Sequence, residues 1–218
     1  MEISYRNVRQ LLRLINGILD LSKVEARKLT LESSPFDLVA MMHDCAATMS
    51  PAFEQKGLLF EMTIEPGTWR YWVGDAERLQ AEVLLNLIGN SIKFTARGSI
   101  IVEAAPQAGP AGTEGLPFEV TDTGCGGQLD KAHRIFEDFQ QAGDAMNRPY
   151  EGTGLGLSIA KTLVEMMAVN ISVEHPSDPG SRFLFTVFFG KTTEEALAGS
   201  CPAKAGRPGG GGDARAGG

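Results

Sequence analysis

Residues 86–95, NLIGNSIKFT, are the stretch of sequence that decides the fold. They cover the second half of a strongly apolar helix predicted over residues 79–93 and the two residues after it, and they place Asn86, Asn90 and Lys93 on one helical face at steps of four and three. The amide oxygen of Asn90 is a ligand that Mg²⁺ accepts, and Lys93 offers a positive charge to a phosphate. This face predicts a metal and phosphate site, although an asparagine pair on an apolar helix is also typical of a buried structural hydrogen bond.

A second segment, VTDTGCG at residues 120–126, reads as a strand that ends in an acid and a glycine turn. The Asp122 carboxylate there can accept the exocyclic amino group of adenine, while Gly124 and Gly126 let the backbone approach the ring closely. Alone, the pattern is also that of an ordinary turn after a strand, so its weight comes from its neighbours in the sequence.

Two further segments complete the set. In IFEDF, residues 135–139, Phe136 and Phe139 are expected to pack under a mobile segment. In GTGLGLSIAK, residues 152–161, a glycine-rich loop runs into a helix, and its N–H groups with the positive helix end predict a polyphosphate site. The loop lacks the Gly-Lys-Ser/Thr ending of a P-loop, and no strand immediately precedes it as in a dinucleotide fingerprint. Its candidate residues are Gly152, Thr153, Gly154, Leu155 and Gly156.

The first 32 residues form a separate unit in this interpretation. Apolar residues from Val8 to Leu21 recur at steps of three and four, which predicts a long amphipathic helix over residues 8–28. Its apolar stripe favours a helical partner in a bundle, for instance a second copy in a homodimer, over a helix folded back on its own domain. Ser33, Ser34 and Pro35 then break the helix.

A compact domain is expected over residues 36–190 and a disordered Gly/Ala-rich tail over residues 191–218. Runs of strands with helices among them indicate an α+β layer rather than a doubly wound parallel sheet. A Gly/Pro-rich link over residues 106–117 joins two of the strands as a hairpin. Besides the helix at 79–93, helices are predicted at 36–56 and 155–168, and strands at 58–64, 69–73, 99–104, 118–121, 171–174 and 182–189.

Composition excludes several classes of function. The net charge is -7 and no Lys/Arg-rich stripe stands out, which argues against nucleic-acid binding through phosphate neutralisation. Cys45, Cys125 and Cys201 lack metal-like spacing and fit a reducing, cytoplasmic environment. No stretch approaches the roughly 20 apolar residues of a membrane span, so we expect a soluble chain, although a parent protein can still carry a membrane anchor.

The order of the four segments resembles the N, G1, F and G2 boxes of sensor histidine kinases of the hybrid type, and residues 11–26 are similar to the second helix of their dimerisation hairpin. The resemblance implies the Bergerat (GHKL) fold, a two-layer α/β sandwich with a mixed sheet and helices on one face. It also implies ATP and Mg²⁺ as cofactors and a short ATP lid over residues 140–151.

The resemblance further assigns roles to residues. Asn90 would bind Mg²⁺, Asn86 would help shape the metal and phosphate site, and Lys93 would contact phosphate. Asp122 would accept from adenine, and Arg148 of the lid would contact phosphate. The close-approach positions would be Gly124, Gly126, Gly154 and Gly156. Three departures stand against the pattern: Cys125 and Gly127 occupy apolar positions, and Glu151 puts a negative charge where a glycine is usual.

The implied function is transfer of the ATP γ-phosphoryl group to a histidine on a helix that this chain lacks, since His43, His133 and His175 stand outside the phosphoacceptor context. The implied partners are a kinase chain bearing that helix and a response regulator receiver domain, and the isolated chain is expected not to phosphorylate itself. One alternative is an ATPase of the same fold, but Asn86 stands where such enzymes have a glutamate base. Another is a non-catalytic ATP-binding module that regulates a partner kinase.

Overall fold

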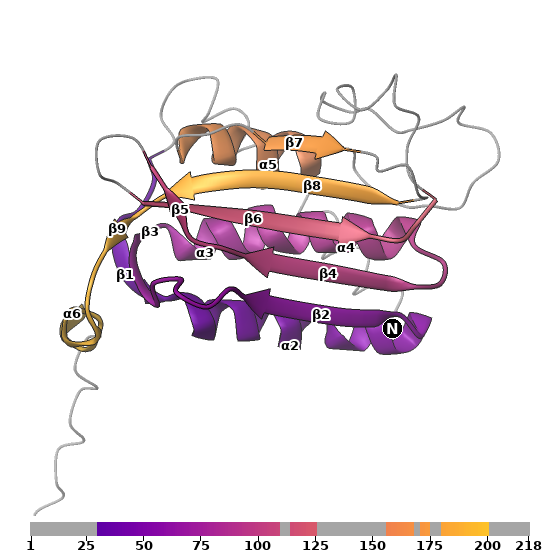
Figure 1. Ribbon diagram of the computed structural model, residues 1–218, viewed down its shortest axis with the longest axis horizontal. Coiled ribbons are helices and arrows are strands. Elements are labelled where there is room, and N and C mark those ends of the chain that lie inside the picture. The colour runs from indigo at the N-terminus through magenta and orange to yellow at the C-terminus, as the bar shows by residue number, and fades with distance from the viewer. Residues whose placement is uncertain (1–29, 110–113, 126–155, 168–170, 175–179, 201–218) are drawn as a thin grey trace, which may run out of the picture.

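The computed structural model describes residues 30–109, 114–125, 156–167, 171–174 and 180–200. Within these ranges, a layer of helices covers one face of a six-stranded sheet (Figure 1). Neighbouring strands β2 and β4 are parallel and the other pairs are antiparallel, so the sheet is mixed and the predicted α+β class is confirmed. In spatial order the strands are β2 (Leu59–Ile64), β4 (Ser99–Ala104), β6 (Glu114–Asp122), β8 (Ser181–Phe188) and β7 (Ile171–Glu174), with β5 (Gln107–Ala108) beside β6.

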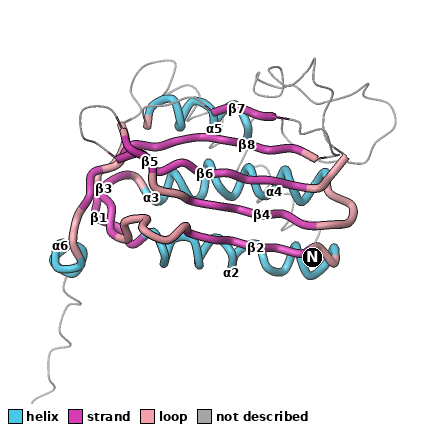
Figure 2. The backbone as a smooth tube through the Cα atoms, viewed as in Figure 1, coloured by secondary structure: helices cyan, strands magenta, loops and turns pink. Residues whose placement is uncertain are grey.

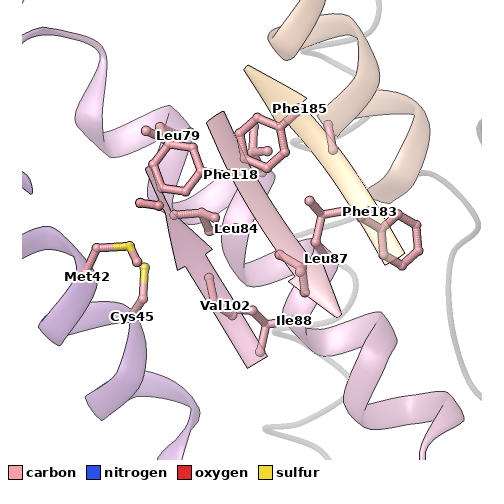
Figure 3. Packing of buried hydrophobic residues seen from close by; sticks show 14 of the residues in the cluster. Met42, Cys45, Leu79, Leu84, Leu87, Ile88, Val102, Phe118, Phe183 and Phe185 are labelled. Atoms are coloured by element: carbon pink, nitrogen blue, oxygen red, sulfur yellow. The ribbon is translucent and has the colours of Figure 1, made fainter. Parts of the chain in front are cut away.

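The core lies between this sheet and the helices α2 (Leu38–Lys56), α4 (Leu85–Phe94) and α5 (Gly156–Met166), which run behind it (Figure 2). Strands alternate their side chains between two faces, and the inward residues of β6, such as Phe118 and Val120, are buried. Figure 3 shows Leu87 and Ile88 of α4 packed toward the sheet, where Phe118 stacks on Phe185 with ring centroids 5.1 Å apart. Burial of each such side chain contributes about 1.5–3 kcal/mol.

The central helix is interrupted, whereas the sequence predicted one helix over residues 79–93. It begins as α3 (Ala76–Arg78), continues as a π-helical segment, η1 (Leu79–Leu84), and ends as α4. Asp75 caps its start, because the Arg78 N–H donates to Asp75 Oδ1 at 3.0 Å. Wide helical turns of this kind frequently occur at functional sites.

The predicted helix at 36–56 is wrong at its beginning. Residues Ser34–Asp37 form strand β1, which pairs with β3 (Tyr71–Gly74), so the domain starts before residue 36. The helix begins at Leu38 because Asp37 Oδ1 accepts hydrogen bonds from the N–H groups of Val39 (2.9 Å) and Ala40 (3.2 Å).

The predicted disorder from residue 191 onward is also wrong for its first part. Strand β9 (Gly190–Lys191) pairs with β3, and helix α6 (Glu194–Ser200) lies against β1. A residue far away in the sequence, Trp69, stabilises this stretch. Its indole N–H donates to the Thr192 carbonyl at 2.9 Å, and Lys191 Nζ lies 4.8 Å from the centre of its ring. The predicted N-terminal helix and residues 201–218 lie outside the described residues.

Candidate nucleotide site

Asn86 and Asn90 are half-buried on α4 and have defined orientations. Nδ2 of Asn86 donates to the Glu82 carbonyl at 2.6 Å, and Nδ2 of Asn90 donates to the Asn86 carbonyl at 2.9 Å. Because the NH₂ groups bind the backbone, the side-chain oxygen is the atom that each residue presents to a ligand. An oxygen donor of this kind on Asn90 fits Mg²⁺, which usually takes one or two protein oxygens and completes its shell with phosphate oxygens and water.

The apolar face of the same helix explains why the amides of Asn86 and Asn90 lie away from the core, where a ligand can reach them. Leu87, Ile88 and Ile92 are buried against the sheet, which fixes the rotation of α4 about its axis. Lys93 is half-buried beside the exposed Phe94, with Nζ 5.1 Å from the ring centre. Burial lowers the pKa of Lys93 below its ordinary value, because taking the ammonium out of water disfavours the charged form. An anionic ligand at this position would favour the charged form again.

Asp122, the last residue of β6, points into the helix layer and is only 4% exposed. Its Oδ1 accepts a hydrogen bond from the Gly124 N–H at 2.9 Å, which fixes the carboxylate in its rotamer. Gly124 itself is buried, and the Cys125 N–H after it donates to the Phe94 carbonyl at 3.3 Å. The structure therefore brings the predicted adenine acceptor to the end of the helix that carries Asn90 and Lys93.

Two glycines that the sequence analysis passed over make room for the backbone on either side of Asp122. A Cβ on Gly180 would stand 2.2 Å from the Asp122 carbonyl oxygen, and a Cβ on Gly98 would stand 2.0 Å from Thr123 Oγ1. Both also have positive φ, +152° for Gly180 and +121° for Gly98, a conformation that other residues rarely adopt. The site thus depends on neighbouring strands that approach closely at Asp122 and Thr123.

Lys56, the last residue of α2, was likewise not singled out from the sequence. Its ammonium donates to three carbonyl oxygens at the end of α4: those of Ile92 (2.5 Å), Lys93 (3.3 Å) and Thr95 (3.3 Å). Carbonyls at a helix C-terminus lack partners within the helix and carry partial negative charge, so a lysine there stabilises them. Lys56 in this way anchors the turn from which Lys93 projects.

Replacement of Lys56 by methionine is expected to lower the free energy of unfolding by about 1 kcal/mol, because the apolar length is kept while the three carbonyls lose their cation. Urea denaturation followed by circular dichroism measures the change. Gln55→Met, one residue earlier on the exposed side of α2, is the matched control and should leave the midpoint within error. Equal midpoints for the two variants would contradict this role of Lys56.

The remaining candidates are placed only in part. Gly156 is the first residue of α5, which packs against η1 and α4. His43 is exposed on α2. In the part of the chain that the structure describes, no three His, Cys, Asp or Glu side chains gather as metal ligands, and no helix is long and apolar enough to cross a membrane. The following lie outside the described residues: Gly126, Gly127, His133, Phe136, Phe139, the lid with Arg148 and Glu151, Gly152, Thr153, Gly154, Leu155 and His175.

Comparison with known proteins bears on this geometry. Residues 74–191 match the family described as histidine kinase-, DNA gyrase B- and HSP90-like ATPase. The chain belongs to this family. The match runs from the last residue of β3 to β9, so it includes α4 and the end of β6, which carry Asn90, Lys93 and Asp122, but not Lys56.

Relatives of this chain include sensor kinases. GacS, a sensor histidine kinase of Pseudomonas protegens, is 36% identical over 191 residues, which are 88% of this chain but 21% of GacS. The crystal structure of full-length ShkA in complex with AMPPNP has a TM-score of 0.71 at 31% identity, covering 84% of this chain and 36% of ShkA. Histidine kinase ThkA in complex with response regulator protein TrrA gives 0.61 at 20% identity, covering 85% of this chain and 49% of that one, which shows the fold alone. The chain thus spans about a fifth of the length of GacS.

Proposed function

We propose that this histidine kinase-like domain binds Mg-ATP and transfers the γ-phosphoryl group to a histidine side chain on a helix of a partner kinase chain. The observation that carries the proposal is the buried Asp122 carboxylate, held by the Gly124 N–H at the end of the helix that bears Asn90 and Lys93. A base acceptor and a phosphate-binding face then belong to one site, as a nucleotide requires.

Each residue has a limited task in this reaction. Asp122 binds the 6-amino group of adenine, Asn90 with Asn86 presents oxygen toward the metal-bound phosphates, and Lys93 offsets the charge of the phosphate oxygens. Bound Mg²⁺ would supply further positive charge at the transferring group. The bond between the γ-phosphorus and the ADP oxygen breaks while a bond to the imidazole nitrogen forms, and catalysis consists of positioning and charge neutralisation.

Hydrolysis by the same site is disfavoured by Asn86. The residue one helical turn before Asn90 is an amide whose NH₂ donates to the Glu82 carbonyl, and an amide does not accept a proton from water at neutral pH. Transfer to an imidazole therefore agrees better with this site than rapid release of phosphate.

Labelled ATP tests the proposal directly. The chain is incubated with Mg²⁺ and labelled ATP, alone and with a separately purified dimerisation hairpin of a sensor histidine kinase, and acid-labile label is counted on each protein. We expect label on the hairpin only, and none on a hairpin whose histidine is replaced by glutamine. Label on the chain alone would contradict the assignment of acceptor and donor to separate segments, and rapid phosphate release without label would indicate an ATPase.

Asn90→Ala is expected to remove the magnesium dependence of binding. Calorimetry should show that Mg²⁺ raises the ATP affinity of the unmodified chain by about tenfold or more, as expected for an added charge-assisted interaction. In Asn90→Ala the affinities with Mg²⁺ and with EDTA should become similar, while the EDTA value itself stays near that of the unmodified chain. A full magnesium effect in the variant would count against Asn90 as the ligand.

The proposal extends to partners and location. The helix that the sequence predicts from Val8 to Leu21 would form a homodimer or pair with the helix of a partner kinase chain, and the receiver domain of a response regulator would take the phosphoryl group from the histidine. ThkA, which shares the fold, has been crystallised with its response regulator protein TrrA. A cytoplasmic location agrees with ATP as the substrate.

A further inference from the structure

Two hydroxyl groups are buried at the end of α4 without a visible role in the fold. Ser91 is 1% exposed and Thr95 is fully buried. Neither Ser91 Oγ nor Thr95 Oγ1 has a hydrogen-bond partner within the described part of the chain. Buried polar groups in proteins nearly always have one, so each exception calls for an explanation.

The Thr95 hydroxyl lies close to the Asp122 carboxylate. Thr95 Oγ1 is 2.9 Å from the point at which a Cβ of residue 124 would stand, and Asp122 Oδ1 is 2.8 Å from the same point. Ser91 lies one helical turn earlier on the stripe of α4 that faces the sheet, and its carbonyl accepts from the Thr95 N–H at 3.0 Å. One unpartnered hydroxyl of α4, that of Thr95, therefore lies beside the end of β6, and a second, that of Ser91, is buried one helical turn earlier.

Other threonines of the domain show that this situation is not general. Thr121 Oγ1 donates to Glu119 Oε1 at 2.9 Å, and Thr162 Oγ1 donates to the Ser158 carbonyl at 3.0 Å. A buried hydroxyl without such a bond destabilises the unliganded protein, because the group has lost its hydrogen bonds to water and gained none in return. A polar ligand that enters between Asp122 and α4 would supply the missing hydrogen bond.

We propose that Ser91 and Thr95 are base-binding residues, whose hydroxyls bind a ring nitrogen of the purine next to the amino group that Asp122 accepts, directly or through one ordered water. The proposal rests on the assignment of Asp122 to the base. Adenine presents an amino donor with ring-nitrogen acceptors on either side of it, N1 and N7. A carboxylate next to a hydroxyl matches this pattern, because the hydroxyl can donate where the carboxylate only accepts.

The test measures affinity and stability together. Thr95→Val keeps the shape of the side chain and removes the hydroxyl, and Ser91→Ala removes the other. Each should lower ATP affinity by about 5- to 20-fold, as for one lost hydrogen bond, without lowering the urea midpoint, because the removed group has no partner in the free protein. Thr121→Val is the matched control: this residue lies next to Asp122 but on the outer face of β6, and its replacement should leave ATP affinity unchanged.

Purine analogues identify the contact. With 1-deaza-ATP or 7-deaza-ATP, whichever lacks the bound nitrogen, the unmodified chain should bind as weakly as Thr95→Val does. Two results would overturn the proposal. One is an unchanged ATP affinity in both Ser91→Ala and Thr95→Val. The other is that Thr95→Val lowers the affinity for ATP and for both analogues by the same factor. If Asp122 variants still lose ATP in that case, only the hydroxyl assignment fails; if they also bind ATP normally, the proposed function fails as well.

Discussion

Asp122→Asn is expected to lower ATP affinity about 100-fold while the fold is kept. The Gly124 N–H donates to Oδ1 at 2.9 Å, so an asparagine would retain its oxygen there and turn its NH₂ toward the base. The adenine amino group would then face a donor instead of an acceptor. Loss of a hydrogen bond to a charged group, together with two opposed donors, amounts to about 3 kcal/mol.

Calorimetry with ATP and with inosine triphosphate, whose 6-position carries a carbonyl oxygen, measures this effect. The variant should reverse the preference, because its NH₂ can donate to that carbonyl while the carboxylate of the unmodified chain cannot. Asp44→Asn, the same exchange on the exposed side of α2, is the control and should bind ATP normally. Unaltered ATP affinity in Asp122→Asn would contradict the proposal that Asp122 binds the adenine base.

Elements with a strong local pattern could be predicted from the sequence. The run of apolar β-branched residues within 99–104 and the alternation of apolar and polar residues in 171–174 both predicted strands with the observed bounds. The helix predicted at 155–168 agrees in its described part with α5, whose buried residues recur at helical spacing. The family resemblance added what local patterns lack, namely the mixed sheet with helices on one face.

Elements that form through distant partners could not be predicted in this way. β1 and β9 are short strands that exist because both pair with β3, and Phe36, which looks like the start of the helix, instead packs edge-on against Phe189 with ring centroids 5.5 Å apart. Helix α6 follows β9 in a stretch whose Ala and Gly content suggested disorder. Its place against β1 depends on contacts between the two ends of the domain's sequence, which no local pattern reveals.

The candidate site shows the same division. Asn90, Lys93 and Asp122 could be proposed because their chemistry fits a nucleotide and their spacing fits their elements. Lys56 and Thr95 could not, because their importance arises in three dimensions: Lys56 binds carbonyls 36 to 39 residues away, and Thr95 gains its meaning from its position beside Asp122.

Gly124→Ala is expected to weaken ATP binding at least tenfold and to lower the free energy of unfolding by about 1–3 kcal/mol. The new Cβ would stand 2.7 Å from the Phe94 carbonyl oxygen, 2.8 Å from Asp122 Oδ1 and 2.9 Å from Thr95 Oγ1. All three distances are too short, and the first involves backbone, so β6 and the end of α4 must separate and the bond that holds the carboxylate is lost.

Gly89→Ala adds the same methyl group, but we expect it to stabilise the protein and to leave ATP binding intact. Gly89 precedes Asn90 in the middle of α4, and its new Cβ would meet only Met49 Cε, at an ordinary 3.7 Å. Alanine favours a helix interior over glycine by up to about 1 kcal/mol, so this variant should unfold at higher urea and still bind ATP. Calorimetry and urea denaturation of both variants therefore separate close approach at the base from a general effect of added methyl groups. Normal ATP binding by Gly124→Ala would show that the space beside Asp122 is not needed for the nucleotide.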